Sequence, residues 1–573
     1  MKKNAGNVMA DLLVGYGVKA VFGIPGGQTL PLYYGIEDNA PKIKHVLMRE
    51  ESNAVYAADA YARVGGGLGV CDATAGCGAI RFTPGLAESY NSSVPVLAIS
   101  SEMNHDWVAV KHRGCGAQQA NIKSIVAPVT KWTACLPETN SVAEMTNRAV
   151  QMAMTGRPGP VYVEIPFDLF WKEYTGPAYQ ADPNLVELPA FRSTADMGSV
   201  LEAIKVLKQA KKPIMVVGGG AWMSGAKAEI TELAEKLDIP VATSLSGKGA
   251  LDETHPLSVG VMGSLGSNSV ANAMVMEADV VFAIGYKFSQ NSTFYWKFPT
   301  AEQKVIHLDV DDSEFGKTYA LTVGLLGDAK ATLRLMLDEL KEESAKNDPW
   351  RARMEGLRMD WAKEKAHETR EETPILPQQV VAVLNDICDD NTILACDASF
   401  SCGWAGTFFD VYGNRRAIFP RGMSGLGYGL PAGIGAAVAR PDSTVVVLAG
   451  DGGFSYSIGE LATLAEQGLN VKVVLLNNKT LGWIKWYEAY FFNGRFTEAD
   501  THHIDFAQVA EGMGVQSFHF EDPATLKEDL KKALAAEGPA LIDITTTETE
   551  ACKYMENKAA VEAIHADHER LNS

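Results

Sequence analysis

The chain has 573 residues, of which 46% are hydrophobic and 21% charged, and its formal net charge is −19. This length has room for about three domains of ordinary size, and the negative charge argues against nucleic acid or an anionic membrane as a partner. No apolar run reaches the roughly 20 residues needed to cross a bilayer, and residues 1–6 lack a secretory apolar segment.

The cysteine pattern also favours a cytoplasmic protein. Eight cysteines occur, and no two of them form a Cys-x-x-Cys pair. Such spacing is typical of reduced thiols in a cytosol rather than of zinc sites or disulfides. The positions are Cys71, Cys77, Cys115, Cys135, Cys388, Cys396, Cys402 and Cys552.

Residues 1–172 alternate short apolar strands with helical segments. The predicted strands are Ala20–Ile24, His45–Met48, Pro95–Ile99 and Val161–Ile165. An alanine-rich helix is expected after the second strand, with Glu51 in its first turn. Taken alone, Glu51 is an ordinary first-turn carboxylate stabilised by the helix dipole.

A second α/β block is predicted at residues 193–340, after a polar, proline-containing linker at residues 173–183. Its glycine turn, Gly218–Gly220, is only a loose version of a nucleotide-binding fingerprint. Residues 341–375 are dense in Lys, Glu and Arg, so they form either a solvated helix or a second linker. The predicted strands are Ile214–Val217, Val241–Thr243, Val280–Ile284 and Lys304–Leu308.

The third block, residues 376–550, contains the most informative pattern. An apolar strand that begins at Ser443 ends in Gly450-Asp451-Gly452-Gly453, and after a helix at Ser457–Gln467 a second strand, Val471–Asn477, leads to Asn478. Parallel strands place Asp451 and Asn478 side by side at the carboxyl edge of a sheet, where α/β folds bind ligands.

The residue types at that edge predict a metal site. A carboxylate from Asp451 and an amide oxygen from Asn478 suit Mg²⁺ that keeps phosphate oxygens as further ligands, and we assign Thr480 as a third ligand. Glycines let a diphosphate approach the backbone N–H groups. Strand–helix alternation in all three blocks predicts an α/β fold with three doubly wound parallel-sheet domains.

The glycine-aspartate pattern, with 24 residues between Gly452 and Asn477, resembles the diphosphate-anchoring motif of the thiamine-diphosphate enzymes. The segment His45–Arg63 resembles the one in which a glutamate meets the cofactor's aminopyrimidine ring. The resemblance implies that Glu51 is that glutamate and that Glu50 is its solvated neighbour. It also implies a pyrimidine-binding domain at 1–172, a Rossmann-like central domain at 193–340 and a diphosphate-binding domain at 376–550.

The same resemblance assigns further cofactor contacts. Ser399 and Phe400 lie in a segment similar to the loop that meets the diphosphate. Leu426 matches the large apolar side chain that wedges the cofactor into its bent shape; an ordinary core leucine is the alternative. Gln118 matches a glutamine that approaches the reactive carbon, and an ordinary solvated loop residue is the alternative.

Within the superfamily the chain is most similar to the acetolactate (acetohydroxyacid) synthase branch, especially over Asn477–Asp500. This similarity implies that Trp483 and Tyr487 form an apolar substrate wall, with Gly27 and Gln28 opposite them. A helix face that packs on its own domain remains the alternative for the two aromatic residues.

Several segments depart from that branch, in ways that leave the substrate and a flavin open. The synthases usually have Ser-Gly-Pro-Gly-Ala-Thr at Ala75–Ile80, Gly-Gln at Ser101-Glu102, Trp at Tyr487, and a flavin-contacting Arg-Phe-Asp-Asp-Arg at Lys287–Asn291. The first two departures fall near the reactive end of the cofactor, and the last leaves FAD binding undecided.

The resemblance implies decarboxylation of a 2-oxo acid with thiamine diphosphate and Mg²⁺, followed by transfer of the acyl anion equivalent to a second carbonyl. A simple 2-oxo acid decarboxylase and a flavin-dependent 2-oxo acid oxidase are the alternatives. In the family, Glu51 and Asp451 complete one site from two subunits, so we expect a homodimer or homotetramer.

Overall fold

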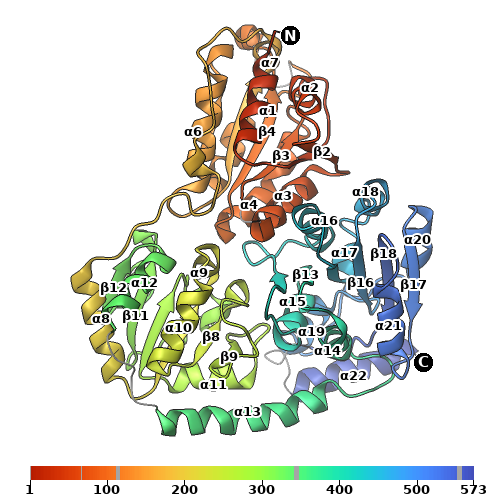
Figure 1. Ribbon diagram of the computed structural model, residues 1–573. Helices are drawn as coiled ribbons and strands as arrows, with labels where there is room; N and C mark the ends of the chain where they lie inside the picture. The colour runs from red at the N-terminus through yellow and green to blue at the C-terminus, as the bar shows by residue number, and fades with distance from the viewer. Residues whose placement is uncertain (1, 66, 111–115, 341–346, 552–557, 573) are drawn as a thin grey trace.

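The computed structural model describes residues 2–65, 67–110, 116–340, 347–551 and 558–572. It has three lobes, each built on a six-stranded sheet in which every neighbouring pair of strands is parallel (Figure 1). The predicted α/β fold with three parallel sheets is therefore confirmed.

The first lobe has the strand order β2-β1-β3-β4-β6-β5. Its strands are β1 (Ala20–Gly23), β2 (Lys44–Leu47), β3 (Gly69–Ala73), β4 (Val96–Glu102), β5 (Trp132–Cys135) and β6 (Val161–Pro166). Its helices are α1 (Ala5–Gly15), α2 (Leu30–Asp38), α3 (Glu51–Gly65), α4 (Phe82–Ser92), α5 (Ile122–Val126), α6 (Val142–Met154) and α7 (Phe167–Trp171).

The central lobe has the order β12-β11-β10-β7-β8-β9. Its strands are β7 (Pro213–Val217), β8 (Val241–Thr243), β9 (Ser258–Val261), β10 (Val280–Ile284), β11 (Lys304–Asp309) and β12 (Val323–Leu326). Its helices are α8 (Met197–Gln209), α9 (Gly219–Met223), α10 (Lys227–Leu237), α11 (Ser269–Glu277) and α12 (Ala329–Glu339).

The third lobe has the order β14-β13-β15-β16-β18-β17. Its strands are β13 (Ile393–Cys396), β14 (Arg416–Ile418), β15 (Val445–Gly450), β16 (Val471–Asn477), β17 (Gln516–Phe520) and β18 (Ala540–Thr545). Its helices are α14 (Pro377–Ile387), α15 (Phe400–Phe408), α16 (Gly429–Ala439), α17 (Asp451–Phe454), α18 (Glu460–Gln467), α19 (Gly482–Phe491), α20 (Phe506–Gly512), α21 (Leu526–Leu534) and α22 (Lys558–Asn572).

The two predicted connections take definite structures. Within the charged stretch, helix α13 (Asp348–Glu368) runs beneath the central and third lobes, so the helical alternative is correct for these residues (Figure 1). The stretch at 173–183 begins by pairing with the N-terminus: Glu173 forms a β-bridge with Asn4, and the N–H of Tyr174 donates to the carbonyl of Lys3. It therefore packs on the first lobe.

The first and third lobes share one hydrophobic core, which holds α3 against α16. Small residues allow this close approach: a Cβ on Gly435 of α16 would lie 2.0 Å from the carbonyl oxygen of Ala57 in α3. The alanine-rich composition of α3, noted in the sequence, thus reflects packing between lobes. This contact fixes the helix that begins with Glu51.

The described residues contain neither a membrane-spanning helix nor a disulfide. None of their helices is long and apolar enough to cross a membrane. No disulfide joins the six cysteines among them, and four of these, Cys71, Cys388, Cys396 and Cys402, are buried. Cys115 and Cys552 lie outside the described residues.

Candidate active site

A cavity of about 360 Å³, called here the cofactor cavity, opens at the carboxyl ends of β15 and β16. The register pairs Gly450 with Leu476, so Asp451 and Asn478 follow neighbouring strands directly. Of the residues predicted from sequence, this cavity is lined by Ser399, Phe400, Leu426, Gly450, Asp451, Gly452, Gly453, Asn478, Thr480 and Trp483.

Asp451 is buried at the start of α17, with 6% of its surface exposed. One carboxylate oxygen accepts the N–H of Gly452 at 2.8 Å and the other accepts the N–H of Lys479 at 2.7 Å. Burial raises the pKa of this carboxyl to about 6, although both hydrogen bonds oppose the shift. A cation at this position would stabilise the ionised form.

The side-chain oxygens of Asn478 and Thr480 already take part in hydrogen bonds within the protein. The side-chain oxygen of Asn478 accepts the N–H of Thr480 at 3.2 Å. The Thr480 hydroxyl donates to the Ala499 carbonyl at 3.0 Å, and the Thr480 carbonyl accepts the N–H of Gly482 at 2.9 Å. Thr480 could therefore ligate a metal through its carbonyl oxygen, which keeps a second lone pair. Asn477 is structural, because its amide donates to Asp543 at 3.0 Å.

These donors fit a magnesium diphosphate better than an isolated metal ion. No group of three or more His, Cys, Asp or Glu in the described chain could hold a metal. With one carboxylate, one amide and one backbone carbonyl, the protein leaves half of the six oxygen positions that Mg²⁺ prefers for phosphate or water. A Cβ on Gly450 would meet no atom within 4 Å, so its backbone faces open space.

Asp397 organises the cavity, and the sequence analysis did not select it. Its carboxylate is fully buried and accepts the N–H groups of Ala398, Gly427 and Gly429 at 2.6, 3.1 and 3.1 Å. It thereby joins the loop before Ser399 to the loop that carries Leu426. Burial raises its pKa to about 6. An aspartate directly after the buried strand β13 was the available signal.

Apolar side chains close one wall of the cavity. Leu426 is 37% exposed, so it is not an ordinary core leucine, and the ring centroids of Phe400 and Trp483 lie 5.3 Å apart. Tyr487 is not among the residues that line this cavity. Its ring lies 4.4 Å from that of Phe491, and it is 41% exposed. Within one chain, only Trp483 of the predicted aromatic pair faces the cavity.

Glu51 begins α3 in the first lobe and is 8% exposed. Burial raises its pKa, and the charge of Glu50 adds to the effect, whereas a backbone hydrogen bond and Arg81, 3.9 Å away, oppose it. A Cβ on Gly78 would lie 2.9 Å from the carboxylate, so glycine leaves it room. Glu50 is not simply solvated, since its carboxylate accepts the N–H of Asn53 at 3.0 Å.

Two predicted glutamines meet near the same loop. The Gln28 amide donates to the Gln118 oxygen at 3.0 Å, and the Thr74 hydroxyl donates to the Gln28 oxygen at 2.8 Å. The Gln118 amide in turn donates to the Cys77 sulfur at 3.3 Å. A Cβ on Gly27 would meet no atom within 4 Å. The loop at residues 74–78 therefore brings Gln28, Gln118 and Glu51 together at one edge of the first sheet.

The two groups of predicted residues do not share a cavity within one chain. Every described residue that lines the cofactor cavity belongs to the central or third lobe. Glu51, Gln28 and Gln118 belong to the first lobe, although α3 packs firmly on α16. A single chain thus presents two separate halves.

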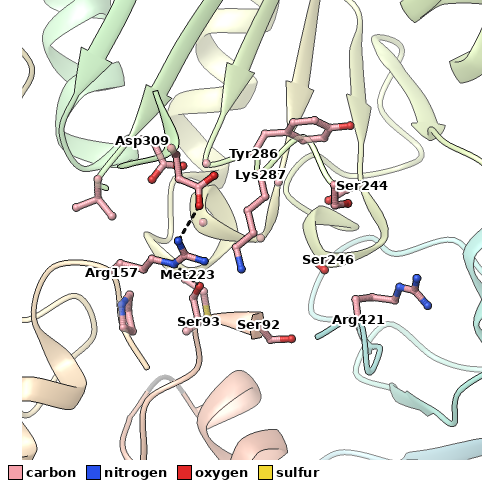
Figure 2. Close-up of a pocket in the computed structure, with 18 of the residues that line it drawn as sticks. Ser92, Ser93, Arg157, Met223, Ser244, Ser246, Tyr286, Lys287, Asp309 and Arg421 are labelled. Carbon is pink, nitrogen blue, oxygen red and sulfur yellow. Dashed lines mark hydrogen bonds and ion pairs between the residues drawn. The ribbon is translucent and has the colours of Figure 1, made fainter. Parts of the chain in front are cut away.

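A larger cavity of about 410 Å³, called here the central cavity, lies between the central sheet and the other two lobes. Figure 2 shows Lys287 pointing from the central sheet toward Ser92 and Ser93 of the first lobe. Burial lowers the pKa of Lys287 to about 8, and Arg157 adds to the effect.

The glycine turn beside the central cavity does not present its amides as a nucleotide fingerprint would. The N–H of Gly218 donates to the carbonyl of Ile284 at 2.9 Å, and that of Gly220 donates to the carbonyl of Gly285 at 3.1 Å. These two groups are therefore not free to bind a phosphate.

Family models match each lobe. Residues 3–125 match "Thiamine pyrophosphate enzyme, N-terminal TPP binding domain", residues 200–336 match the central domain of that family, and residues 397–544 match its C-terminal TPP binding domain. The domain boundaries predicted above remain predictions, since these matches are shorter than the predicted blocks.

Relatives are similar over nearly the whole chain. An acetolactate synthase from Arthrospira platensis is 35% identical over 560 residues, which cover 96% of this chain and 95% of the relative. A probable acetolactate synthase large subunit from Methanocaldococcus jannaschii is 34% identical over 552 residues, covering 93% and 90%. One from Methanococcus aeolicus is 33% identical over 559 residues, covering 94% and 91%.

Proposed function

Because the chain belongs to the thiamine-diphosphate enzyme family and lies near its acetolactate synthase branch, we propose that it decarboxylates a small 2-oxo acid and transfers the acyl anion equivalent to a second carbonyl. The observation that supports this most is the position of Asp451 and Asn478, side by side at one end of a cavity whose other wall is apolar.

The third lobe would hold the cofactor. Asp451, Asn478 and the Thr480 carbonyl would ligate Mg²⁺, and the metal would anchor the diphosphate beside the glycine turn Gly450–Gly453, whose lack of side chains leaves it room. Asp397 would keep the loops around it in place through its three backbone hydrogen bonds. When bound, thiamine diphosphate supplies an electron sink for the pair left behind by CO₂.

Glu51 would move a proton at the other end of the cofactor. Burial raises the pKa of its carboxyl, which brings the group closer to the range in which it can both accept and give a proton near neutral pH. Arg81 is 58% exposed at the side chain and only partly balances this charge. The Gln28–Gln118 pair offers amide groups beside the same loop, where they could orient a substrate carboxylate or carbonyl.

We propose that two subunits complete each active site, in a homodimer or homotetramer. The separation of the Glu51 half from the Asp451 half within one chain supports this assembly. Mixing inactive Glu51→Gln protein with inactive Asp451→Ala protein should restore part of the activity after subunit exchange, since one hybrid dimer then holds one intact site. No recovery after demonstrated exchange would contradict a shared site.

A panel of 2-oxo acids tests the reaction. With thiamine diphosphate and Mg²⁺, pyruvate or another small 2-oxo acid should release CO₂ and give a hydroxy-ketone or acetohydroxyacid when a second carbonyl is present. Aldehyde alone would indicate the simple decarboxylase. Good turnover of aryl or acyl-CoA substrates without turnover of pyruvate would overturn the carboligase assignment and leave the cofactor assignment in place.

A flavin-dependent 2-oxo acid oxidase is the second candidate, and the size of the central cavity, about 410 Å³, favours it. The engaged N–H groups of Gly218 and Gly220 count against it. Purified protein that carries a yellow chromophore and reduces an electron acceptor with pyruvate would select this alternative.

A further inference from the structure

A third pocket, called here the basic cavity, lies where segments from all three lobes meet. Its volume is about 310 Å³, within the range of small-molecule sites. Its walls come from the end of α3, the loop after α9 and the strand β14, and Figure 1 shows α9 on the side of the central lobe that faces the first lobe. It shares no described lining residue with the cofactor cavity, and it borders the central cavity through Leu188, Met223 and Ser224.

Positive charge dominates these walls. Basic side chains line the basic cavity, and no described residue in its lining has a carboxylate. The basic residues are Arg63, Arg192, Lys227, Lys330 and Arg416. Some are neutralised by carboxylates outside the lining: Arg63 pairs with Asp59, Arg192 with Asp328 and Lys227 with Asp252, at 2.5–2.7 Å.

Arg416 and Lys330 form no ion pair of this kind. Burial and the charge of Arg440 lower the pKa of the half-buried Arg416, and Asp252 only partly opposes that shift, whereas Lys330 is exposed. Within the described chain, no carboxylate lies within 4.0 Å of the Arg416 guanidinium, and the Lys330 ammonium makes no hydrogen bond or ion pair. Arg416 donates to the carbonyl of Arg415 at 2.8 Å and lies 5.5 Å from the centre of the Trp222 ring. A half-buried guanidinium without a counter-charge is unfavourable unless an anion joins it.

We propose that the basic cavity binds a phosphate group, either as free phosphate or on a small phosphorylated molecule. Two positive charges without an ion-pair partner within 4.0 Å among the described residues match the charge of about −1.5 to −2 on a phosphate monoester at pH 7. The guanidinium fork of Arg416 can donate two parallel N–H bonds to phosphate oxygens, and Lys330 adds a compact charge. The Trp222 ring, 5.5 Å from the guanidinium carbon, adds a cation–π contact to Arg416.

This site is separate from the proposed reaction, because it uses none of the residues that surround Asp451. Its ligand would contact Arg416 of the third lobe and Lys330 of the central lobe at once. A phosphate bound there would therefore favour the present arrangement of the lobes, since any ligand that binds only the folded state stabilises that state.

Equilibrium dialysis with radiolabelled phosphate tests the proposal. The protein is first saturated with thiamine diphosphate and Mg²⁺, and ionic strength is held constant with chloride, so that neither the diphosphate anchor nor general screening contributes. Wild-type protein should bind phosphate saturably at one site per chain. The double variant Arg416→Gln/Lys330→Gln should lose at least about tenfold in affinity, because both unpaired charges are removed.

Control variants locate the site. Lys363→Gln removes an exposed charge on α13, 79% exposed and paired with Asp360, and should bind phosphate like the wild type. Arg416→Lys keeps the charge but loses the fork, so it should bind with intermediate affinity even if the double variant folds poorly. Competition by glycerol phosphate at lower concentrations than unlabelled phosphate would identify a phosphorylated molecule as the ligand, and equal competition would identify free phosphate.

Three results would overturn the assignment. They are no saturable binding by the wild-type protein, unchanged binding by the folded double variant, or loss of binding in Lys287→Gln with retention in the double variant. The last would place the anion in the central cavity.

Discussion

Replacing Lys485 with methionine should destabilise the segment that carries the cavity-lining residues after Asn478. Lys485 lies on α19, and its side chain is 1% exposed. Its ammonium lies 2.9 Å from Asp500 and 2.9 Å from Asp567 of α22. Burial lowers the pKa of Lys485, but the hydrogen bond to Asp500 and the charge of Asp567 outweigh it and leave the pKa raised. The buried ammonium of Lys485 therefore links α19 to the C-terminal helix α22 through its ion pair with Asp567.

The expected destabilisation arises because the Asp500 and Asp567 carboxylates lose their shared cation. Removing one member of a buried ion pair costs about 3–5 kcal/mol, mainly because the remaining charge stays buried. Two features reduce this figure: the Asp500 carboxylate is 37% exposed, and Asp567 keeps Arg570 at 2.7 Å. We therefore expect the lower end, about 3 kcal/mol of unfolding free energy.

The same change should weaken cofactor binding. Asp500 forms a β-bridge with Thr480, and the N–H of Leu481 donates to the Ala499 carbonyl at 2.7 Å. These contacts hold the segment between Asn478 and α19. Loss of the Lys485 charge should loosen that segment and lower the affinity for thiamine diphosphate measured in the presence of Mg²⁺.

Urea unfolding followed by tryptophan fluorescence measures the stability, and a fluorescence titration measures the cofactor affinity. Lys558→Met on the same C-terminal helix is the matched control, because its side chain is 90% exposed. The double variant Lys485→Met/Asp567→Asn should recover at least about 1 kcal/mol relative to additivity. A Lys485→Met protein within about 0.5 kcal/mol of the control would refute the reasoning, since that is the ordinary effect of a surface substitution.

Three further outcomes are expected. Asp451→Ala should retain its fold but lose more than the roughly 10–100-fold of metal affinity typical of losing an outer-shell partner; calorimetric titration showing wild-type, Mg²⁺-dependent cofactor binding would contradict it. Glu51→Gln should bind cofactor but slow hydrogen–deuterium exchange at its reactive carbon by orders of magnitude, and an unchanged exchange rate would exclude Glu51 from the proton transfer. Burial lowers the pKa of His307 to about 4, below its unfolded value of about 6.5, so the unfolded state binds the extra proton and stability should fall by up to about 3 kcal/mol as pH drops from 6.5 toward 4. In urea titrations at both pH values, His307→Leu should lose that part of the pH dependence, and an identical dependence would exclude the residue as its source.

Local sequence patterns were sufficient to find the three sheets and the candidate metal site. The strand Val471–Asn477 is apolar except at Lys472 and Asn477, because a parallel sheet buries both faces, and this run was predicted with its observed bounds. Asp451 and Asn478 follow neighbouring strands directly, so their meeting depends only on the β-α-β connection. The ends of helices were predicted less accurately. The helix expected from Ser457 begins at Glu460, after the short helix α17.

Only the tertiary structure decided which charged groups are compensated and which halves of a site share a cavity. Asp397 receives three backbone N–H groups, two of them from Gly427 and Gly429 about thirty residues away, and no carboxylate of the described residues lies within 4.0 Å of the Arg416 guanidinium. The separation of Glu51 from the Asp451 cavity within one chain is likewise a matter of how whole lobes pack. Strand periodicity is a property of consecutive residues, whereas burial and charge balance depend on groups that are distant in the chain and become neighbours only when the lobes assemble.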